Sequence, residues 1–393
     1  MRICYIANYR PDRQESMIRF ANWLDRVMRD RGLQTEVLYP KAIMIHLVGG
    51  KTPLAKWLGY IDKFILFPLF LRWHGRLRKN RDVIYHVVDH SNAVYANCLP
   101  GDRTLLTCHD VLAIRGGLGD TDSYCTPSIT GRVLQWWIKR HLHKCPHIVF
   151  VSHATYQDYL NLPTPNGRQK ASAQINQIIY NGLNHDFTKI PDADAVAILK
   201  EINVDPGIPY FFHVGSDHPR KNRIGILAAF NKFMAIHPDY QVIFAGVSFS
   251  QREQSYLDAL EPGKHRVQHV GEVSHEKLVA LYSRAVAFVF PSFSEGFGWP
   301  IIEAQSCGCP VIYGNRTSLP EVAGDTGLPC DPASPESISS ALLSLVDPTV
   351  KEGFIQKGYL NIRRFDPQVT SEKYLEIYRN KYSEQTSPTR AVI

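Results

Sequence analysis

Short apolar runs alternate with amphipathic stretches along almost the whole chain, and this alternation restricts the possible folds more than any other feature. In the first half, five apolar runs predict strands, at residues 2–8, 34–39, 82–88, 104–108 and 147–151. The stretches between them have the apolar spacing of helices, at residues 16–31, 54–78, 131–143 and 154–160. Strands that alternate with helices are typical of parallel sheets covered by helices. The predicted fold class is therefore α/β.

A second series of the same kind begins later in the chain. Its predicted strands lie at residues 210–214, 241–245, 266–270, 287–290 and 311–313. The segment between the two series, 183–209, is polar and contains aspartate and proline. A chain of 393 residues is also too long for one ordinary core. We therefore predict two doubly wound, Rossmann-like domains, at residues 1–190 and 205–365, and a last helix at 368–384.

The stretch SEGFGWPIIEAQSCGCPVI holds two glutamates, Glu295 and Glu303, eight residues apart. Pro300 suits the first turn of a helix, because its missing N–H would be unpaired there in any case, and Gly308 suits the helix exit. A short helix at 299–307 leaves Glu295 in the preceding loop and carries Glu303 itself. Carboxylates accept hydrogen bonds from sugar hydroxyls, while a helix N-terminus offers N–H groups to phosphate. The stretch therefore indicates a nucleotide-sugar site.

A second candidate anion site follows the first apolar run of the second series. The run ends at Gly215 and is followed by SDHPRKN and a helix with apolar spacing. Strand, glycine turn and helix form an anion site, which Arg220 and Lys221 strengthen by their charge. A diphosphate leaving group gains negative charge as its bond to the sugar breaks, so fixed cations lower the barrier. We expect Arg220 to contact phosphate in bidentate fashion and Lys221 to act as a point charge.

Together these motifs resemble the retaining GT-B glycosyltransferases of family four, the glycosyl transferases group 1, and within them the mannosyltransferases. The resemblance implies two Rossmann-like domains that face each other across a cleft, with the last helix packing back on the first. It also implies that Glu295 contacts the transferred sugar, Glu303 the nucleotide ribose and Lys221 the donor phosphate. This chain has Ser216 where relatives commonly carry arginine. We expect Arg220 to supply the missing charge.

The resemblance extends to the rest of the donor site. It implies that the strand end and the loop before the short helix approach the donor, and that the main chain after the strand at 266–270 meets the nucleobase. The residues concerned are Gly215, Val273, Gly296, Phe297 and Gly298.

Candidate acceptor residues lie in the first half. The turn Thr-Cys-His-Asp at 107–110 resembles the T-x-H-D turn of the same family, which implies that His109 positions donor and acceptor. Asp89 and His90 form a similar polar strand end and are candidates for contacts with acceptor hydroxyls. Many relatives carry a Gly-Gly turn after the first strand, but residues 9–16 contain no glycine. We expect Arg13, or its neighbour Arg10, to bind phosphate by its side chain, or this loop to serve the acceptor.

Metal and nicotinamide cofactors are not expected. Residues 120–122 and 192–194 each read Asp-x-Asp, the metal motif of the other large glycosyltransferase architecture, but neither follows a predicted strand. Arg220 and Lys221 make a metal unnecessary for the leaving group, so the only co-substrate expected is the nucleotide-diphosphate sugar. No G-x-G-x-x-G follows any predicted strand, which argues against a dehydrogenase.

The expected activity is transfer of a hexose with retention of its anomeric configuration. GDP-mannose is the preferred donor and UDP-glucose the second, and the acceptor is a glycan or lipid-linked glycan in polysaccharide biosynthesis. No carboxylate suits the role of nucleophile, so we expect front-face departure and attack. A sugar-nucleotide epimerase of GT-B fold is one alternative, and a noncatalytic sugar-nucleotide or glycan-binding protein is another.

Residues 51–81 carry eight lysines and arginines, one aspartate and many aromatic and aliphatic side chains. Such a segment can lie in an anionic membrane interface, where each basic residue adds about 1 kcal/mol, or it can pack on the sheet with its charges in solvent. The net charge of +7 comes with no nucleic-acid recognition motif, so nucleic acid is not an expected partner. The eight cysteines show no metal or disulfide spacing and are expected to be buried thiols.

The expected location is the cytoplasm, peripheral on the inner face of the cell membrane. The first residues, MRICYIANYRP, contain too short an apolar stretch for a signal peptide, and no run of 18 apolar residues suggests a membrane span.

Overall fold

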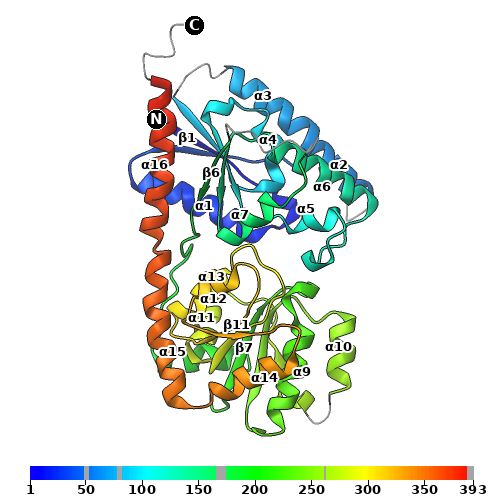
Figure 1. Ribbon diagram of the computed structural model, residues 1–393, viewed down its shortest axis with the longest axis vertical. Coiled ribbons are helices and arrows are strands. Elements are labelled where there is room, and N and C mark those ends of the chain that lie inside the picture. Colours follow the sequence, from blue (N-terminus) through cyan, green and yellow to red (C-terminus); the bar gives the residue numbers. More distant parts are fainter. Residues whose placement is uncertain (48–52, 78–81, 165–173, 261–262, 387–393) are drawn as a thin grey trace. The chain divides into compact units, whose positions relative to one another are not determined.

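The computed structural model describes residues 1–47, 53–77, 82–164, 174–260 and 263–386. The chain divides into two compact units. The first comprises residues 1–120, 125–184 and 367–393, and the second comprises residues 121–124 and 185–366. Each unit contains a parallel sheet with helices against it (Figure 1), so the predicted α/β class is confirmed.

The first unit is built on a parallel sheet, sheet A, in the order β2-β1-β3-β4-β5-β6. Its strands are β1 (Arg2–Ile6), β2 (Gln34–Leu38), β3 (Val83–Val87), β4 (Thr104–Cys108), β5 (His147–Phe150) and β6 (Ile175–Ile178). The register sets Ile6 opposite Val87, so the C-terminal ends of neighbouring strands lie at one edge. The first five strands confirm the predictions. β6 was not predicted, because its sequence INQI alternates between exposed and half-buried positions without a continuous apolar run.

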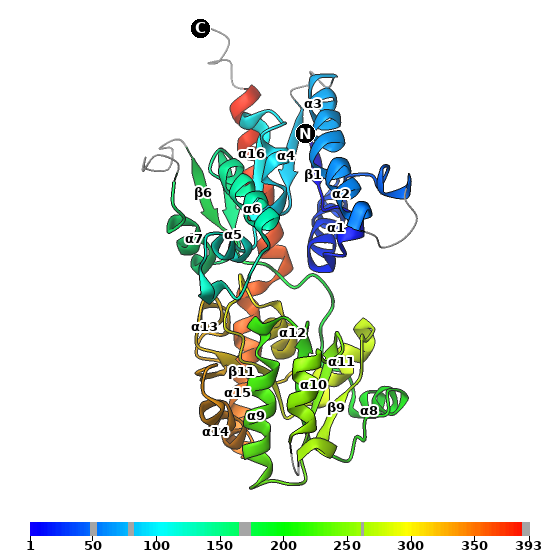
Figure 2. The ribbon, with the colours of Figure 1, turned by 90° about the vertical axis from the view of Figure 1, so that its right-hand side faces the viewer.

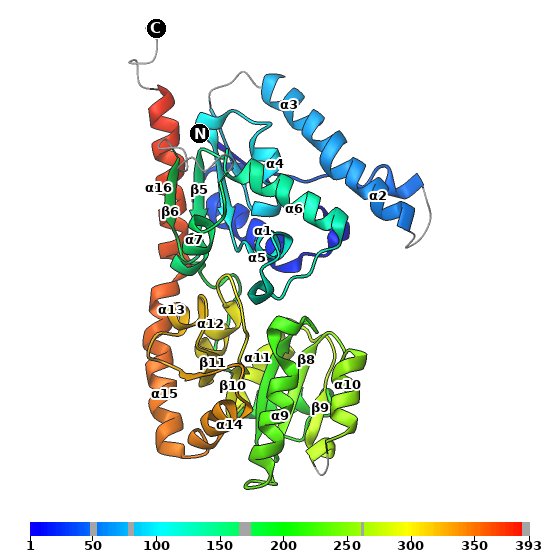
Figure 3. The same ribbon diagram turned by 45° about the vertical axis from the view of Figure 1, so that its right-hand side comes forward.

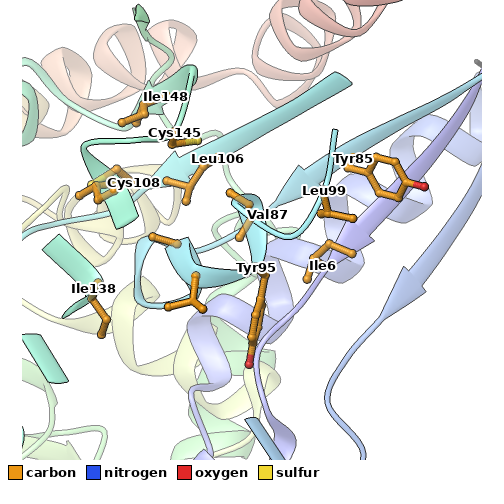
Figure 4. Close-up of a cluster of buried hydrophobic side chains, with 14 of the residues drawn as sticks. Ile6, Tyr85, Val87, Tyr95, Leu99, Leu106, Cys108, Ile138, Cys145 and Ile148 are labelled. Carbon is orange, nitrogen blue, oxygen red and sulfur yellow. The ribbon is translucent and has the colours of Figure 1, made fainter. Parts of the chain in front are cut away.

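Helices cover both faces of sheet A. One face packs against helices through a large buried apolar cluster, part of which is drawn in Figure 4, where Val87 and Leu106 of the sheet face Ile138. On the other face, His86 is hydrogen-bonded to Tyr378 of the last helix at 2.7 Å. The helices of this unit are α1 (Glu15–Asp30), α2 (Pro53–Ile61), α3 (Phe67–Leu77), α4 (Ala93–Ala96), α5 (Leu112–Gly117), α6 (Ile129–Leu142), α7 (His153–Leu160) and α16 (Pro367–Thr386).

The helix predicted at 54–78 is interrupted. A π-helical turn, η3 (Asp62–Leu66), joins α2 to α3, and residue 78 lies outside the described residues. Its first residue, Asp62, is only 1% exposed and accepts hydrogen bonds from the hydroxyl of Tyr9 and the backbone N–H of Met44. A buried carboxylate requires such partners. The π turn therefore turns Asp62 inward in a stretch that otherwise reads as one amphipathic helix.

The second unit is built on a parallel sheet, sheet B, in the order β12-β11-β10-β7-β8-β9. Its strands are β7 (Tyr210–Gly215), β8 (Gln241–Gly246), β9 (Val267–His269), β10 (Ala287–Phe290), β11 (Val311–Gly314) and β12 (Leu328–Cys330). The first five confirm the predictions. β12 was not predicted, because it is three residues long and contains a proline, which strand patterns normally exclude.

Helices also cover both faces of sheet B (Figure 2). Phe211 packs with α9, α10 and α14 in one apolar cluster, whereas its neighbour Phe212 meets Tyr282 of α11 on the opposite face. The helices of this unit are α8 (Asp192–Glu201), α9 (Arg223–Met234), α10 (Gln251–Asp258), α11 (His275–Arg284), α12 (Trp299–Ser306), α13 (Leu319–Ala323), α14 (Pro335–Ser344) and α15 (Pro348–Asn361). The segment 183–209, described from the sequence as polar and containing aspartate and proline, includes α8, in which Ala195 and Leu199 are buried.

All eight cysteines are free thiols, and six of them are buried. The burial of these six agrees with the expectation of buried thiols, whereas Cys98 and Cys125 are half-buried. Within the described residues, no helix has the length and apolar character needed to cross a bilayer.

Candidate functional site

The loop after β7 presents two cations. Gly215 ends the strand, and the short 3₁₀ turn Pro219–Lys221 begins with proline and ends at Asn222, which adopts a left-handed conformation (φ 57°). The amide of Asn222 donates to the carbonyl oxygens of Pro291 (3.2 Å) and Pro332 (2.6 Å). These bonds tie the turn to the loops beyond β10 and β12.

Arg220, Lys221 and Glu295 form an ionic triad. The Lys221 Nζ lies 2.7 Å from Glu295 Oε1, and the Arg220 Nη1 lies 2.5 Å from Glu295 Oε2. The same Arg220 nitrogen donates to the carbonyl oxygen of Ser294 at 3.1 Å. The triad is largely buried, with side-chain exposures of 23% for Arg220, 13% for Lys221 and 9% for Glu295. The sequence predicted all three residues as donor-site residues but not that they pair.

The charges of the triad keep Glu295 ionised. Burial alone would raise the pKa of this carboxyl, but the charges of Lys221 and Arg220 outweigh burial and lower the pKa to about 2. Two cations and one carboxylate leave the triad with one net positive charge. A site of this charge at the C-terminal edge of a parallel sheet suits an anionic ligand that also carries hydroxyl groups.

The loop from β10 to α12 is held by two residues of the following loop. The Glu295 N–H donates to Thr317 Oγ1 at 3.1 Å, and the Ser318 hydroxyl lies 2.9 Å from the carbonyl oxygens of Glu295 and Phe297. Gly298, at φ 109°, leads into α12. A Cβ there would approach Leu319 to 2.8 Å, so glycine is required both for the turn and for space. The predicted helix at 299–307 is confirmed, with its end one residue earlier.

The remaining predicted donor residues lie on several elements of the second unit. Glu303 lies in α12 and accepts a hydrogen bond from the hydroxyl of Tyr282 at 3.3 Å. Phe297 is 4% exposed and packs against Phe365, with ring centroids 5.7 Å apart. Val273 lies in the loop between β9 and α11 and is half-buried. Gly296 and Gly298 flank Phe297 in the loop before α12.

In the first unit, the ends of β1, β3 and β4 bring together a polar cluster of Asn8, Asp89, His90 and His109. The Asn8 amide donates to Asp89 at 2.6 Å, and the His90 Nδ1 lies 3.1 Å from Asp89. All four residues are less than 9% exposed. Burial would lower the pKa of His90, but the charge of Asp89 outweighs it and raises the pKa. The charge of His90 in turn holds the pKa of Asp89 well below its usual range, against the effect of burial.

His109 is held as a neutral imidazole beside this pair. Its Nε2 donates to the carbonyl oxygen of Val88 at 3.0 Å, and its ring packs edge-on against Phe20, with centroids 4.8 Å apart. Burial lowers the pKa of His109 to about 4, which the charge of Asp89 partly opposes. Because Nε2 donates, Nδ1 carries the lone pair and can accept a proton or a hydrogen bond.

Other sequence candidates lie apart from these two groups. The side chain of Arg13 is exposed, and its backbone is left-handed (φ 52°) where the short turn Arg10–Asp12 ends. Asp120 accepts a hydrogen bond from Arg115 at 2.6 Å, and Asp192, in the first turn of α8, lies 3.3 Å from Arg284. Within the described ranges, no group of three or more His, Cys, Asp or Glu side chains could hold a metal ion.

Several residues that position the site were not predicted from the sequence. Asn8 follows β1, which pairs with β3, the strand before Asp89, so a polar residue at this position could have indicated it. Thr317 and Ser318 follow β11 in the same way. Tyr282 lies on α11, far from any motif, and only the fold brings it to Glu303.

Part of the chain matches a known family. Residues 197–359 match the family model described as glycosyl transferases group 1. O-antigen chain mannosyltransferase B of Escherichia coli is 36% identical over 43% of this chain and 45% of its own length. O-antigen chain mannosyltransferase RfbU of Salmonella typhimurium is 29% identical over 53% of both chains. The chain thus spans about half the length of these curated relatives.

Solved structures resemble the whole chain in fold. Sucrose-phosphate synthase from Thermosynechococcus elongatus has a TM-score of 0.70 at 20% identity and covers 98% of this chain and 100% of its own. Anabaena HepE in complex with UDP and glucose has a TM-score of 0.66 at 15% identity, and the match covers 96% of this chain and 99% of HepE. At such identities the likeness concerns the fold alone. With its two wound sheets, the chain has the GT-B fold of these structures, and residues 197–359 are similar to the glycosyl transferases group 1.

Proposed function

We propose that this chain is a retaining hexosyltransferase that moves mannose from GDP-mannose to a glycan or lipid-linked glycan in polysaccharide biosynthesis. Relatives named as mannosyltransferases support the sugar, among them a protein of Corynebacterium glutamicum described as GDP-mannose-dependent, 27% identical over 42% of this chain. UDP-glucose is the second candidate donor, since Anabaena HepE has been solved with it.

The ionic triad is the observation that carries this proposal. A diphosphate bound against Arg220 and Lys221 would replace Glu295 as their counter-ion, at least in part. Both cations would then stabilise the charge that develops on the leaving diphosphate, without a metal ion. Glu295, released from these contacts, would accept hydrogen bonds from the sugar hydroxyls. Glu303 would bind the ribose of the nucleotide, and the backbone at Val273 would contact its base.

Retention is proposed to follow from departure and attack on the same face of the sugar. The bond between the anomeric carbon and the phosphate oxygen breaks, and the acceptor oxygen bonds to that carbon from the same side. The departing phosphate oxygen takes the acceptor proton. In the first unit, the neutral His109 is proposed to position the sugar, and Asp89 and His90 to bind acceptor hydroxyls.

A donor screen tests the proposal. The protein is incubated with GDP-mannose, UDP-glucose and ADP-glucose, with EDTA present, and with and without an oligosaccharide acceptor. We expect transfer from one donor only, dependent on acceptor, with the product anomer unchanged. Conversion of the donor without acceptor would identify an epimerase, and selective binding without turnover would identify a noncatalytic protein. An inverted product would refute the front-face mechanism.

The membrane proposal rests on an apolar patch in the first unit. The helices α2 and α3, the η3 turn between them and α6 belong to the first unit (Figure 3). Phe64 of η3 lies against Trp137 of α6, with ring centroids 5.2 Å apart. The apolar patch consists of eight side chains on these helices that are each more than half exposed: Leu54, Trp57, Ile65, Leu69, Trp73, Ile129, Val133 and Trp136. The cations Lys56, Arg72, Arg132 and Arg140 are exposed on the same helices. Such a patch suits the interface of an anionic membrane, on its cytoplasmic side.

Replacing Trp57 and Trp73 by serine is expected to weaken binding to phosphatidylglycerol vesicles by at least tenfold, because burying one large apolar side chain contributes about 1.5–3 kcal/mol. Vesicle sedimentation measures the change. Leu360→Ser and Ile236→Ser are matched controls, since both side chains are 60% exposed in the second unit. Equal binding of the double variant and the wild type would rule the apolar patch out as a membrane surface.

A further inference from the structure

The first unit contains an apolar cavity of about 490 Å³ beside β2, the edge strand of sheet A. Ligand sites for small molecules commonly have about 300–1,000 Å³. The cavity walls come from three segments, the end of β2, the loop after it and the η3–α3 helix, and include Val37, Leu38, Ile43, Leu66, Phe67 and Phe70. Its lining is therefore mainly hydrocarbon.

Among the described residues that line the cavity, Asp62 is the only one with a carboxylate, and this carboxylate is already hydrogen-bonded. Asp62 accepts hydrogen bonds from the Tyr9 hydroxyl (3.1 Å) and from the backbone N–H groups of Met44 (2.9 Å) and Ile45 (3.3 Å). These bonds fix the loop that carries Ile43 against the π turn. The cavity thus has a fixed shape and an apolar interior.

A row of aromatic rings connects the cavity with the apolar patch. Phe67 in the cavity wall is 6% exposed, Phe70 is 39% exposed and Trp73 of the apolar patch is 61% exposed. Their ring centroids are 5.9 Å and 6.4 Å apart in that order. A hydrocarbon chain can therefore pass from the surface to the cavity along apolar side chains.

The cavity also has cations at its rim. Lys41 lines it and is exposed, and the guanidinium of Arg10 lies 4.2 Å from the ring centroid of Tyr39, another lining residue. The nearby Lys63 is paired with Asp12 at 2.5 Å, so its charge is neutralised. A hydrocarbon cavity with two cations at its rim suits a chain that ends in a phosphate.

Three consecutive residues link the cavity to the polar cluster. Asn8 donates to Asp89 of the polar cluster, Tyr9 donates to Asp62 in the cavity wall, and Arg10 lies at the rim. Tyr9 and Arg10 begin the glycine-free loop 9–16, and Asn8 directly precedes it. A ligand can thus have its hydrocarbon in the cavity, its phosphate at Arg10 and its sugar towards Asp89.

We propose that the cavity beside β2 binds the hydrocarbon chain of the acceptor, and that the acceptor is therefore a glycan carried on a lipid phosphate, with the phosphate held by Arg10 and Lys41. This inference rests on the proposed transferase function and names the class of acceptor that the first unit selects.

Filling the cavity tests the inference. Val37→Phe is expected to weaken binding of decyl phosphate, used below its micelle concentration, at least tenfold, because each CH₂ shut out of the cavity weakens binding about fourfold. Binding of ethyl phosphate should not change. Titration calorimetry measures both. Ile175→Phe is the matched control, since Ile175 lies on β6, the opposite edge strand of the same sheet, and is 47% exposed.

A second variant tests the inference in case Val37→Phe does not fold. Ile43 is 55% exposed at the rim, so Ile43→Glu should fold and should also weaken decyl phosphate binding. Arg10→Gln combined with Lys41→Gln should weaken binding of decyl phosphate but not of decanol. Unchanged decyl phosphate binding in both Val37→Phe and Ile43→Glu would overturn the inference, as would an equal loss of ethyl phosphate binding.

Two further measurements separate the acceptor from other occupants. In transfer assays, Val37→Phe should raise the KM for a long-chain lipid phosphate acceptor without changing kcat or the KM for the donor. Its binding to phosphatidylglycerol vesicles should equal that of the wild type; a parallel loss would show that the cavity takes bulk membrane lipid, and would refute the acceptor assignment. The binding of decyl phosphate does not depend on sugar transfer. It therefore tests whether the cavity binds a lipid phosphate even if the protein turns over no donor.

Discussion

Replacing Glu295 by glutamine is expected to lower kcat by about 10²–10³, the usual effect of removing one preorganised electrostatic partner, while affinity for the nucleoside diphosphate stays unchanged or rises. The carboxylate pairs with both Lys221 and Arg220 and so competes with a diphosphate for them. Removing the carboxylate frees both cations to bind the phosphates. It also removes the hydrogen-bond acceptor that is proposed for the hydroxyl groups of the donor sugar. Steady-state kinetics gives kcat, and titration calorimetry gives the affinity for GDP.

Glu253 offers a matched control for this variant. It is also a buried glutamate of the second unit, 5% exposed and paired with Arg223 at 3.4 Å. Glu253→Gln should therefore show what the loss of a buried ion pair does to the free energy of unfolding, with kcat unchanged. If Glu295→Gln lost GDP affinity and kcat together, the carboxylate would serve to fix the geometry of the cations, and its role at the sugar would be wrong.

The sequence predicts the sheets well because eight of the ten predicted strands are largely buried; only the edge strands β2 and β9 are more exposed. All ten predicted strands exist, since apolar runs of this kind have few other places in a soluble fold. Of the four edge strands, β2 and β9 were predicted, whereas β6 and β12, which carry little apolar surface, were missed. The π turn at Asp62 was missed for another reason. One inserted residue barely changes the period of the apolar positions in a helix, and the hydrogen-bond partner that holds Asp62 inward, Tyr9, is distant in sequence.

The candidate site was predicted residue by residue but not as an arrangement. Local motifs indicated Lys221 and Glu295 separately, because a turn with cations and a turn with a carboxylate each have a recognisable sequence. Lys221 and Glu295 are 74 residues apart in the chain, and they pair because β7 and β10 are adjacent in sheet B. The same holds for Asn8 and Asp89, which meet because β1 pairs with β3.

Lys221→Ala is expected to lower both the affinity for GDP and the rate. Loss of a hydrogen bond to a charged group costs about 1.5–3 kcal/mol, or roughly 10–150-fold in affinity. The lost transition-state stabilisation should lower kcat by about 10²–10³. The ammonium is held in place, 2.7 Å from Glu295 and 4.8 Å from the ring centroid of Phe290, so its charge is fixed before the donor arrives. Calorimetry with GDP and steady-state kinetics measure the two effects, and Lys232→Ala, which breaks the exposed pair with Glu336, should change neither.

The double variant Lys221→Ala with Glu295→Ala decides whether the carboxylate competes with the donor. In the single variant Lys221→Ala, Arg220 alone must balance Glu295, and little of its charge is left for a diphosphate. Removing Glu295 as well returns Arg220 to the phosphates. We therefore expect the double variant to bind GDP more tightly than Lys221→Ala while kcat stays as low as in Glu295→Ala. Strictly additive losses of affinity would mean that Glu295 does not compete for the cations, and that the diphosphate and the carboxylate contact them at the same time.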